Sequence, residues 1–369
     1  MLFAPLARAA PPQAKWLILA HLDGRNGLGQ AVDAYEHQLR VAGGRYGFSV
    51  ALQVAADQPP PHKTLRRVLL RPGKPPTIEQ VLPRASAADA LADFIAWASS
   101  AQPAEHYALL VMGHGAGLLA GLTALPPGAL RPETMRAGLR QACQKLGQPL
   151  DVVCLDTCYG ATLEVLYGLQ GLCRYATAAP GLIFSPGLDW AGALSDLASD
   201  PVSPSLVRGL VSRGMSRREA GLALVGVDMA QLGPVCDKTR VLSEQLQAHL
   251  TDEMLSLTWV RAHSRSWGDH AELADVAALA SGLEGNAATP AVRGAAAELT
   301  EALSRLVMAF WESDGAAGHG ALGVYYPPTL AEAPPEYRSA YEFASVCGWA
   351  ALLESYWVRV TQVLTATTP

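Results

Sequence analysis

The 369-residue sequence lacks long runs of one charge, CxxC cysteine pairs and a typical secretory signal. Its net charge is −5 and its basic residues are scattered, which argues against a nucleic-acid or membrane partner and favours a protein or peptide partner. The six cysteines are too few for a disulfide framework in a chain of this length. We therefore expect reduced thiols in a cytoplasmic protein.

A membrane span is also missing from the sequence pattern. The most apolar stretch, residues 107–125, contains His114 and several glycines and ends at Pro126, so it reads better as two elements with a functional loop between them. Half of the residues are hydrophobic, which allows a large buried core. Residues 1–14 lack the basic-then-apolar order of a signal peptide and are interpreted as an N-terminal tail.

Apolar runs alternate with helical patterns through the first two thirds of the chain. Strands are expected at 15–24, 48–56, 66–73, 106–115, 150–156, 173–180 and 221–228, with helices at 27–44, 86–100 and 132–147. The strands at 106–115 and 150–156 flank one helix, so a right-handed crossover should make them parallel neighbours. This pattern predicts an α/β/α sandwich with a mostly parallel central sheet.

The composition turns helical after residue 228. Amphipathic helices are expected at 231–250 and 289–315, followed by a late strand at 320–327 that two prolines end. The predicted organisation is a tail at 1–14, an α/β domain at 15–228 and a mainly helical region with a late strand at 229–369.

Two of the predicted parallel strands end in residues that carry chemistry. One runs into GHGAG and the other into DTCYG, so His114 and Cys158 should meet at the carboxyl edge of the sheet. Imidazole can take the proton of a thiol and return it, which is the requirement for a cysteine nucleophile with a histidine general base and acid. The alternative is that neither residue is catalytic: Cys158 would be a buried core residue and His114 a residue of a loop turn.

Neighbouring residues add to this pattern. Gly115 leaves its backbone N–H unobstructed, so the amides of Gly115 and Cys158 are the candidate oxyanion donors. Asp156 at the end of a buried strand needs a partner or solvent, whereas Cys154 inside that strand fits the core. Glu164 on the following helix is expected to hold the helix start or the loop in place.

Three motifs resemble the clostripain family of cysteine peptidases, within the caspase-like and gingipain-like clan. The family pattern has DGxN, HGxG and DxCxxxxxEV in this order. The sequence has HLDGRNGL at 21–28, LLVMGHGAG at 109–117 and CLDTCYGATLEV at 154–165. Later segments at 179–190, 221–232 and 320–327 also resemble the family, so the similarity runs almost end to end.

The resemblance implies a caspase-like fold and peptide-bond hydrolysis after a basic residue, with Arg preferred over Lys. It assigns His114 and Cys158 to a catalytic dyad that forms a thioacyl-enzyme, and Asp156 to the pocket for the basic side chain. Asp189 is a second candidate for that pocket. Some relatives depend on calcium, but the sequence has no EF-hand loop, and we predict no cofactor and no metal site.

The sequence departs from the family at Leu118, where an aromatic residue is usual, and in the segment between the dyad strands. Several relatives are activated by self-cleavage there. In this chain Arg131 precedes Pro132, a bond that fits a protease groove poorly, and the other basic residues lie on the predicted helix at 132–147. We predict that self-cleavage in this segment is not required, while an activating protease or a regulatory partner stays possible.

Three other functions fit parts of the sequence less well or less specifically. A serine esterase would need a GxSxG elbow, which the segment IFSPG around Ser185 lacks. A catalytically silent caspase-like scaffold, or a zymogen that awaits an activator, is the main alternative. A metal enzyme is the remaining alternative, because four possible ligands occur close together in the sequence: His263, Asp269, His270 and Glu272. Their spacing is not that of a metal-ligand set, so a polar surface is the better interpretation.

Overall fold

The structure is a computed structural model of the chain. It describes residues 13–56, 64–84, 86–115, 130–185, 187–215, 221–267, 271–313, 322–328 and 337–366.

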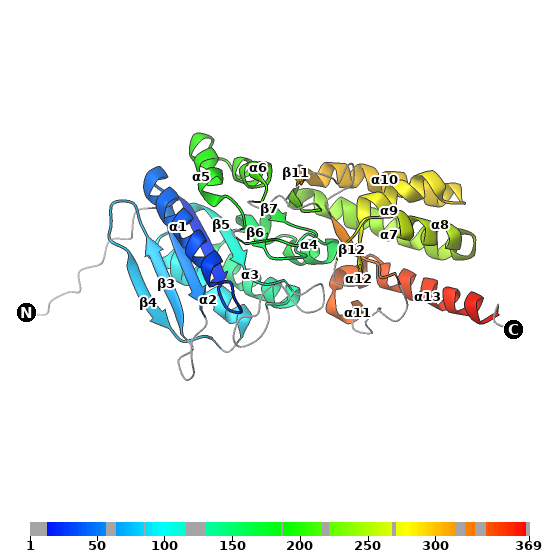
Figure 1. The fold of residues 1–369 in the computed structure, drawn as a ribbon, viewed down its shortest axis with the longest axis horizontal. Coiled ribbons are helices and arrows are strands. Elements are labelled where there is room, and N and C mark those ends of the chain that lie inside the picture. Colours follow the sequence, from blue (N-terminus) through cyan, green and yellow to red (C-terminus); the bar gives the residue numbers. More distant parts are fainter. Residues whose placement is uncertain are drawn as a thin grey trace, which may run out of the picture.

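A nine-stranded sheet forms the centre of the fold, in the order β11-β8-β7-β6-β5-β1-β2-β3-β4 (Figure 1). Its strands are β1 (Ala14–Asp23), β2 (Ser49–Ala55), β3 (Leu65–Leu70), β4 (Thr77–Val81), β5 (Ala104–Met112), β6 (Leu150–Asp156), β7 (Cys173–Ala178), β8 (Ala223–Asp228) and β11 (Val307–Glu312). The five central strands, from β7 to β2, are parallel, while β3, β4, β8 and β11 run antiparallel to their neighbours. The predicted parallel pairing of the strands at 106–115 and 150–156 is confirmed as β5 and β6.

Helices cover both faces of this sheet. They are α1 (Gly29–Tyr46), α2 (Ala87–Ala101), α3 (Pro132–Leu146), α4 (Leu163–Leu169), α5 (Trp190–Ser199) and α6 (Ser203–Arg213). Alternate residues of β1 enter different cores: Ile18 packs with α1, α5 and α6, whereas Leu17 packs with α2, α3 and α4. The predicted α/β/α sandwich is therefore confirmed.

Local signals in the sequence mark several helix ends. Ser86 caps α2 by accepting the Asp89 N–H at 3.1 Å, as its place before an apolar helical pattern predicts. Pro132 lies in the first turn of α3, and Gly147 ends that helix in the left-handed conformation with φ 71°. These ends bracket the crossover between β5 and β6.

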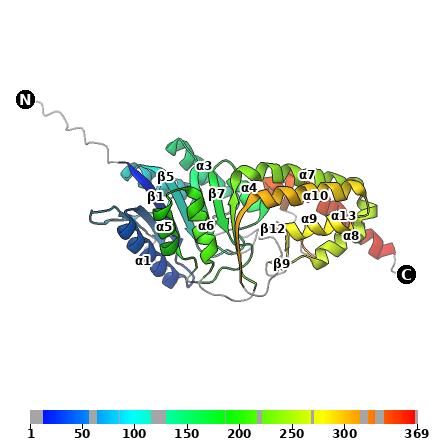
Figure 2. The same ribbon diagram turned by 90° about the horizontal axis from the view of Figure 1, so that it is seen from above.

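The last part of the chain adds a helical layer at one end of the sandwich (Figures 1 and 2). Its elements are the 3₁₀ helix η1 (Met229–Gln231), α7 (Leu232–Ala248), α8 (Leu250–His263), β9 (Ser266–Trp267), β10 (Leu273–Asp275), α9 (Val276–Asn286), α10 (Pro290–Leu306), β12 (Gly323–Tyr325), α11 (Tyr337–Ala340), α12 (Glu342–Val346) and α13 (Trp349–Ala366). β9, β10 and β12 form a small antiparallel sheet, which contains the predicted late strand. None of the helices that the structure describes is long and apolar enough to cross a membrane.

One expected helix is wrong in its second half. The pattern at 289–315 predicts one amphipathic helix, but α10 ends at Leu306 and Val307 begins strand β11. This strand pairs with β8, so the backbone of Val307–Glu312 extends the central sheet. Val307, Phe310 and Trp311 suit a strand as well as an apolar helix face, and the available edge of β8 decides between them. Strand β4 was also not predicted from the sequence.

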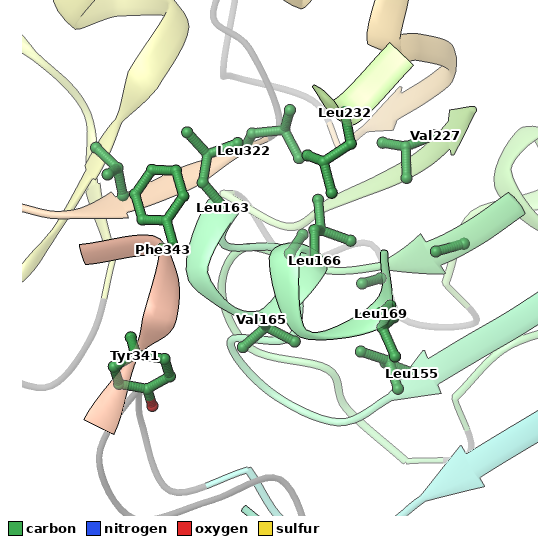
Figure 3. Packing of buried hydrophobic residues seen from close by; sticks show 14 of the residues in the cluster. Leu155, Leu163, Val165, Leu166, Leu169, Val227, Leu232, Leu322, Tyr341 and Phe343 are labelled. Atoms are coloured by element: carbon green, nitrogen blue, oxygen red, sulfur yellow. The ribbon is translucent and has the colours of Figure 1, made fainter. Parts of the chain in front are cut away.

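Helix α4 joins the sandwich to the later part of the chain. Its apolar side chains lie between the sheet, the 3₁₀ segment and the region around α12 (Figure 3). The contacting side chains include Leu155, Leu163, Leu166, Leu232, Leu322, Tyr341 and Phe343. The hydrophobic core is thus continuous across residue 228, and the division of the chain at this residue stays a prediction.

Candidate active site

The predicted active-site residues follow two neighbouring strands. Met112, the last residue of β5, is paired in register with Asp156, the last residue of β6, so His114 and Cys158 lie at equivalent positions just beyond the sheet. The two segments touch directly: a Cβ added to Gly115 would lie 2.8 Å from the backbone N and C of Cys158. The fold therefore brings the two segments together at the carboxyl edge, as the strand pattern predicts.

Cys158 occupies a tight turn between β6 and α4. Tyr159 has the left-handed φ of 61° and donates its N–H to the carbonyl of Gly181 at 2.8 Å. A bulky residue in this conformation is strained, and such strain is held only where the surroundings determine it. The turn presents the half-buried Cys158 thiol between β6 and the segment that follows β7.

Backbone amides surround the Cys158 sulfur. The Ile183 N–H donates to Sγ at 3.4 Å, and the amides of Gly115 and of Cys158 itself also face it. Burial raises the pKa of the Cys158 thiol, the Ile183 and Gly115 amides oppose this rise, and the nearby charge of Asp156 adds to it. A thiol with a raised pKa needs a base to lose its proton near neutral pH.

The imidazole of His114 is exposed and is oriented by one contact. Its Nε2 lies 3.0 Å from the backbone carbonyl oxygen of Asn26, which leaves Nδ1 on the other side of the ring. Asn26 has φ 58°, a conformation that asparagine tolerates better than most residues. A carbonyl acceptor at Nε2 favours the tautomer that carries the proton there, so that Nδ1 is able to accept a proton.

The turn that carries Asn26 is fastened by an ion pair within the DGxN motif. Nε and Nη2 of Arg25 donate to Oδ1 and Oδ2 of Asp23, each at 2.7 Å, and the backbone N–H of Arg25 donates to Asp23 Oδ1 at 3.2 Å. Burial raises the pKa of Asp23, while the hydrogen bonds from Arg25 and the charge of His114 oppose the rise. A bidentate pair of this kind restricts the turn geometry.

Asp156 and Cys158 line the same open pocket. Its other walls come from the start of α1, from Met112 and Gly113, and from residues 183–185 and Gly187 after β7. The Asp156 side chain is buried, and Tyr35 of α1 donates its hydroxyl proton to Asp156 Oδ2. Burial raises the pKa of Asp156 to about 7, and the Leu188 amide partly offsets this effect.

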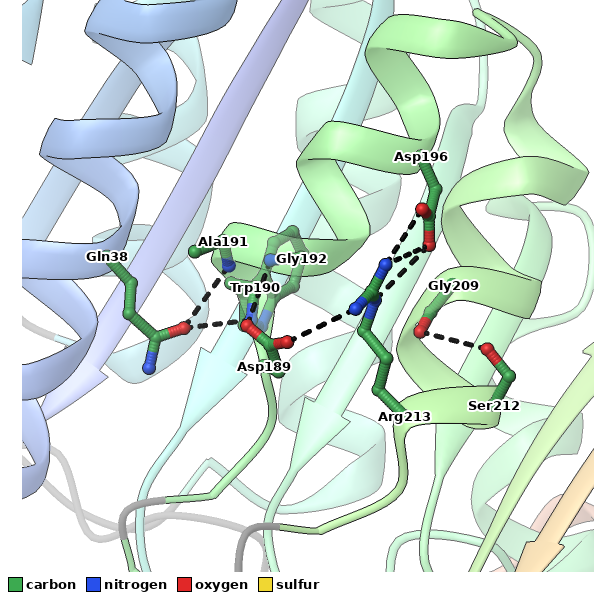
Figure 4. Close-up of polar contacts among 9 residues, drawn as sticks. All are labelled: Gln38, Asp189, Trp190, Ala191, Gly192, Asp196, Gly209, Ser212 and Arg213. Atoms are coloured by element: carbon green, nitrogen blue, oxygen red, sulfur yellow. Dashed lines mark hydrogen bonds and ion pairs between the residues drawn. The ribbon is translucent and has the colours of Figure 1, made fainter.

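Asp189 has a different setting from Asp156. It caps α5 by accepting the Gly192 N–H at 2.9 Å, and it pairs with Arg213 at 3.6 Å (Figure 4). Arg213 also binds Asp196 on the same surface, at 2.8 Å. These contacts are those of a helix cap, and Asp189 is not among the described residues that line the pocket of Cys158, so its role in substrate binding stays a prediction.

Glu164 links α4 to two distant segments. Its buried Oε1 accepts the Tyr325 N–H at 2.8 Å and the Tyr337 hydroxyl at 2.7 Å, which ties α4 to β12 and α11. Burial raises the pKa of Glu164, and the hydrogen bonds from Tyr337 and Tyr325 oppose this rise. The EV part of the cysteine motif therefore anchors the helix that follows the thiol.

No cluster of three or more His, Cys, Asp or Glu side chains with metal-binding geometry occurs among the residues that the structure describes. His263 stacks on Trp259 with ring centroids 4.2 Å apart and bonds the Trp259 carbonyl at 2.8 Å. Asp269 and His270 lie outside the described residues. The expected absence of a metal site stays a prediction, and a dependence on calcium is suggested by the resemblance alone.

The sequence pattern did not identify three groups of this site: the Tyr35 hydroxyl, the Asn26 carbonyl and the Ile183 amide. Asn26 lies in the DGxN motif, which marked the turn but not the role of its carbonyl oxygen. Tyr35 and Ile183 reach the site from segments distant from Cys158, and no local pattern distinguishes them. Ser185 lines the pocket from an irregular segment rather than a strand-to-helix elbow, which disfavours the serine esterase alternative.

The chain is similar to a known protein family and to several solved structures. The model of the clostripain family matches residues 84–357. No curated protein sequence matches the chain. Solved structures with a similar fold include a secreted C11 cysteine protease from Bacteroides thetaiotaomicron in complex with an irreversible peptide inhibitor, with 15% identity and a TM-score of 0.66 over 91% of this chain and 99% of that one.

Two further solved structures cover the same share of this chain. The C11 protease iotapain from the same organism is 12% identical, with a TM-score of 0.69 over 91% of this chain and 100% of that chain. An inactive zymogen C11 protease from Parabacteroides distasonis is 16% identical, with a TM-score of 0.62 over 91% and 99%. These likenesses confirm the caspase-like fold, and the family match over most of the sequence shows that the chain belongs to the clostripain family of cysteine peptidases.

Proposed function

We propose that this cysteine peptidase is an endopeptidase that cleaves after a basic residue, Arg in preference to Lys, through Cys158 and His114. The observation that carries the proposal is the pocket that Cys158 shares with the buried carboxylate of Asp156. A buried carboxylate beside the nucleophile favours a substrate that brings a positive charge to it. The planar guanidinium of Arg can engage such a carboxylate through two donors, whereas the Lys ammonium acts as a point charge.

Acylation begins when substrate binding brings the scissile carbonyl carbon against Cys158. His114 takes the thiol proton on Nδ1 as Sγ forms a bond to that carbon, and the carbonyl oxygen becomes an oxyanion. The amides of Gly115 and Cys158, which lie against the Cys158 sulfur, are the proposed donors to it. His114 then gives the proton to the leaving amine, the C–N bond breaks, and a thioacyl-enzyme remains.

Deacylation uses the same groups in the reverse roles. His114 removes a proton from water as the water oxygen attacks the thioester carbon, and the amides again stabilise the oxyanion. Collapse of this intermediate breaks the C–S bond, releases the new carboxyl terminus and returns the proton to Cys158. The Asn26 carbonyl at 3.0 Å from Nε2 supports this cycle because it holds the ring in one orientation.

The test is cleavage of matched fluorogenic peptides that end in Arg, Lys, Asp or Leu before the reporter. The wild type should prefer Arg, and Cys158→Ala and His114→Ala should lose activity with all four peptides. Cys154→Ala is the matched control, because Cys154 lies in the preceding strand β6 and is buried in the core. Preference for Asp or Leu, or full activity in Cys158→Ala, would overturn the proposal.

Two further arms concern regulation. Assays with added calcium and with a chelator test whether calcium affects activity. We expect equal activity in both.

We also propose that the chain acts without cleavage between the dyad strands. Arg131 precedes Pro132, and Arg136 lies on the formed helix α3 and pairs with Glu342. Mass spectrometry of the active enzyme should find an intact chain. A silent intact chain that gains activity only after cutting there would contradict this expectation.

A further inference from the structure

Tyr35 joins three segments at the base of the specificity pocket. Its side chain is 1% exposed and comes from the middle of α1. The hydroxyl oxygen accepts the Leu188 N–H at 2.6 Å and also contacts Asp156 Oδ2. An amide can only donate, so the single hydroxyl proton of Tyr35 is directed to the Asp156 carboxylate.

The space around this hydroxyl is closely filled. Gly187 has φ 74°, and a Cβ added there would lie 2.7 Å from Asp156 Oδ2 and would also collide with the Tyr35 hydroxyl. Only glycine allows the backbone to pass so close to both groups. The 187–188 turn, the end of β6 and α1 thus determine one another's positions at this point.

A second contact ties α1 to the same segment. Gln38 lies one helical turn after Tyr35, and its Oε1 accepts the Trp190 N–H at 2.9 Å and the Ala191 N–H at 3.3 Å (Figure 4). Residues three apart share a face of a helix, so Tyr35 and Gln38 together hold the chain that leaves the pocket. Gln38 carries no charge, and among the described residues the donors to the Asp156 carboxylate are the Tyr35 hydroxyl and the Leu188 amide.

We propose that Tyr35 is the positioning residue of the specificity pocket: its hydroxyl holds the Asp156 carboxylate charged and in place for a basic side chain. This inference rests on the proposed function. A hydrogen bond donated to a carboxylate stabilises its charged form. Because burial raises the pKa of Asp156 to about 7, such a donor decides how much of this carboxylate is charged near neutral pH. Among the described residues, Tyr35 and Cys158 are the other titratable groups that line the pocket.

The experiment compares Tyr35→Phe with the wild type on peptides that carry Arg, Lys or citrulline at the cleavage site. Citrulline has the shape of Arg without its charge. Loss of a hydrogen bond to a charged group should raise KM for the Arg peptide about tenfold near neutral pH, with a smaller change in kcat. KM for the citrulline peptide should change little, and the acid limb of kcat/KM should move to higher pH. Tyr46→Phe on the same helix is the matched control.

A merely structural role for Tyr35 predicts a different result. If Tyr35→Phe keeps the wild-type ratio of Arg to citrulline cleavage and the wild-type acid limb, the inference is overturned. 3-Fluorotyrosine at position 35 keeps the side-chain shape but is a stronger donor, so it should move the acid limb to lower pH even if Tyr35→Phe does not fold. An unmoved limb in that protein overturns the inference as well. If the wild type cleaves no basic-site peptide, the proposed function fails first, whatever the variants do.

Discussion

Gly115 shows how one residue lets two strand ends approach. Its position opposite the Cys158 peptide leaves no room for a side chain, because a Cβ there would lie 2.8 Å from two backbone atoms. Cβ atoms do not come so close to other heavy atoms in proteins. The atoms contacted here belong to the backbone, which cannot move aside as the end of a flexible side chain can. Gly115 therefore has a steric role in addition to the amide it presents to the sulfur.

We expect Gly115→Ala to lower kcat/KM by ~10²-fold, the cost that is typical of a displaced oxyanion donor. The fold should survive, because the segment is at the surface of the sheet edge. Measurements of kcat/KM and of the thermal midpoint test this. Gly44→Ala on α1 is the control, since nothing lies within 4 Å of a Cβ there and alanine favours the helix. Wild-type activity in Gly115→Ala would show that the segment relaxes without effect.

Asp275 predicts a pH dependence of stability that is independent of catalysis. Its buried carboxylate caps α9 by accepting the Ala277 and Ala278 N–H groups at 2.9 and 3.1 Å. Burial raises the pKa of Asp275 to about 7, and the capping amides oppose this rise. Between the unfolded pKa and this value the native state holds more protons, so the free energy of unfolding falls as pH rises.

Asp275→Asn keeps the capping oxygen and removes this titration. The contribution amounts to ~3 kcal/mol between about pH 5 and about pH 8, at ~1.4 kcal/mol per unit. Urea unfolding should therefore show a smaller loss of stability with rising pH in the variant than in the wild type. His21, whose pKa burial lowers to about 4, acts with the opposite sign in both proteins and cancels in the comparison. Exposed Asp237→Asn is the control, and equal pH slopes in the variant and the wild type would contradict this account.

At the scale of secondary structure elements, α4 depends on Glu164 for its position after the thiol. Glu164→Ala would leave the Tyr325 amide and the Tyr337 hydroxyl without their acceptor in a buried site. We expect a loss of roughly 2–4 kcal/mol in the free energy of unfolding, because both donors stay desolvated. Glu164→Gln keeps an oxygen for both donors and should stay within about 1 kcal/mol of the wild type.

Urea unfolding of both variants tests this role of Glu164. Equal stability of Glu164→Ala and Glu164→Gln would contradict it. If Glu164→Ala also loses peptidase activity at temperatures where the protein stays folded, then α4 also holds the Cys158 turn in position.

At the scale of the whole molecule, the late segments complete the early ones. β11 pairs with β8 at the edge of the central sheet, and side chains from α7, β12 and α12 pack on α4. Arg265 also pairs with Glu312 of β11 and donates to the Gly221 carbonyl before β8. Removing these segments would expose a sheet edge and part of the core to solvent.

We therefore expect a chain that ends at Asp228 to lack cooperative unfolding. The full chain should unfold in one transition with coincident near-UV and far-UV circular dichroism signals. A fragment of residues 1–228 should show no near-UV signal and should aggregate. If this fragment unfolds cooperatively, the predicted division at residue 228 is a true domain boundary.

The positions of many site residues can be predicted from the local sequence, because these residues lie where strands end. Apolar runs predict β5 and β6, the crossover makes them parallel, and the residues just after each strand must then meet at one edge. Periodicity and chain order, both of which the linear sequence contains, therefore predict that His114, Gly115, Asp156 and Cys158 lie at this edge. The pocket role of Asp156 came instead from the resemblance to the clostripain family.

The sequence by itself thus determined the strand-helix alternation, the edge that holds the site and the two residue types needed for cysteine peptidase chemistry. Only the tertiary structure decided that Val307–Glu312 forms a strand, that Asp189 caps a helix and that Tyr35 holds Asp156. The physical reason is distance along the chain. Local patterns set backbone preferences within a few residues, whereas a hydrogen bond between α1 and β6 exists only after packing has brought these elements together.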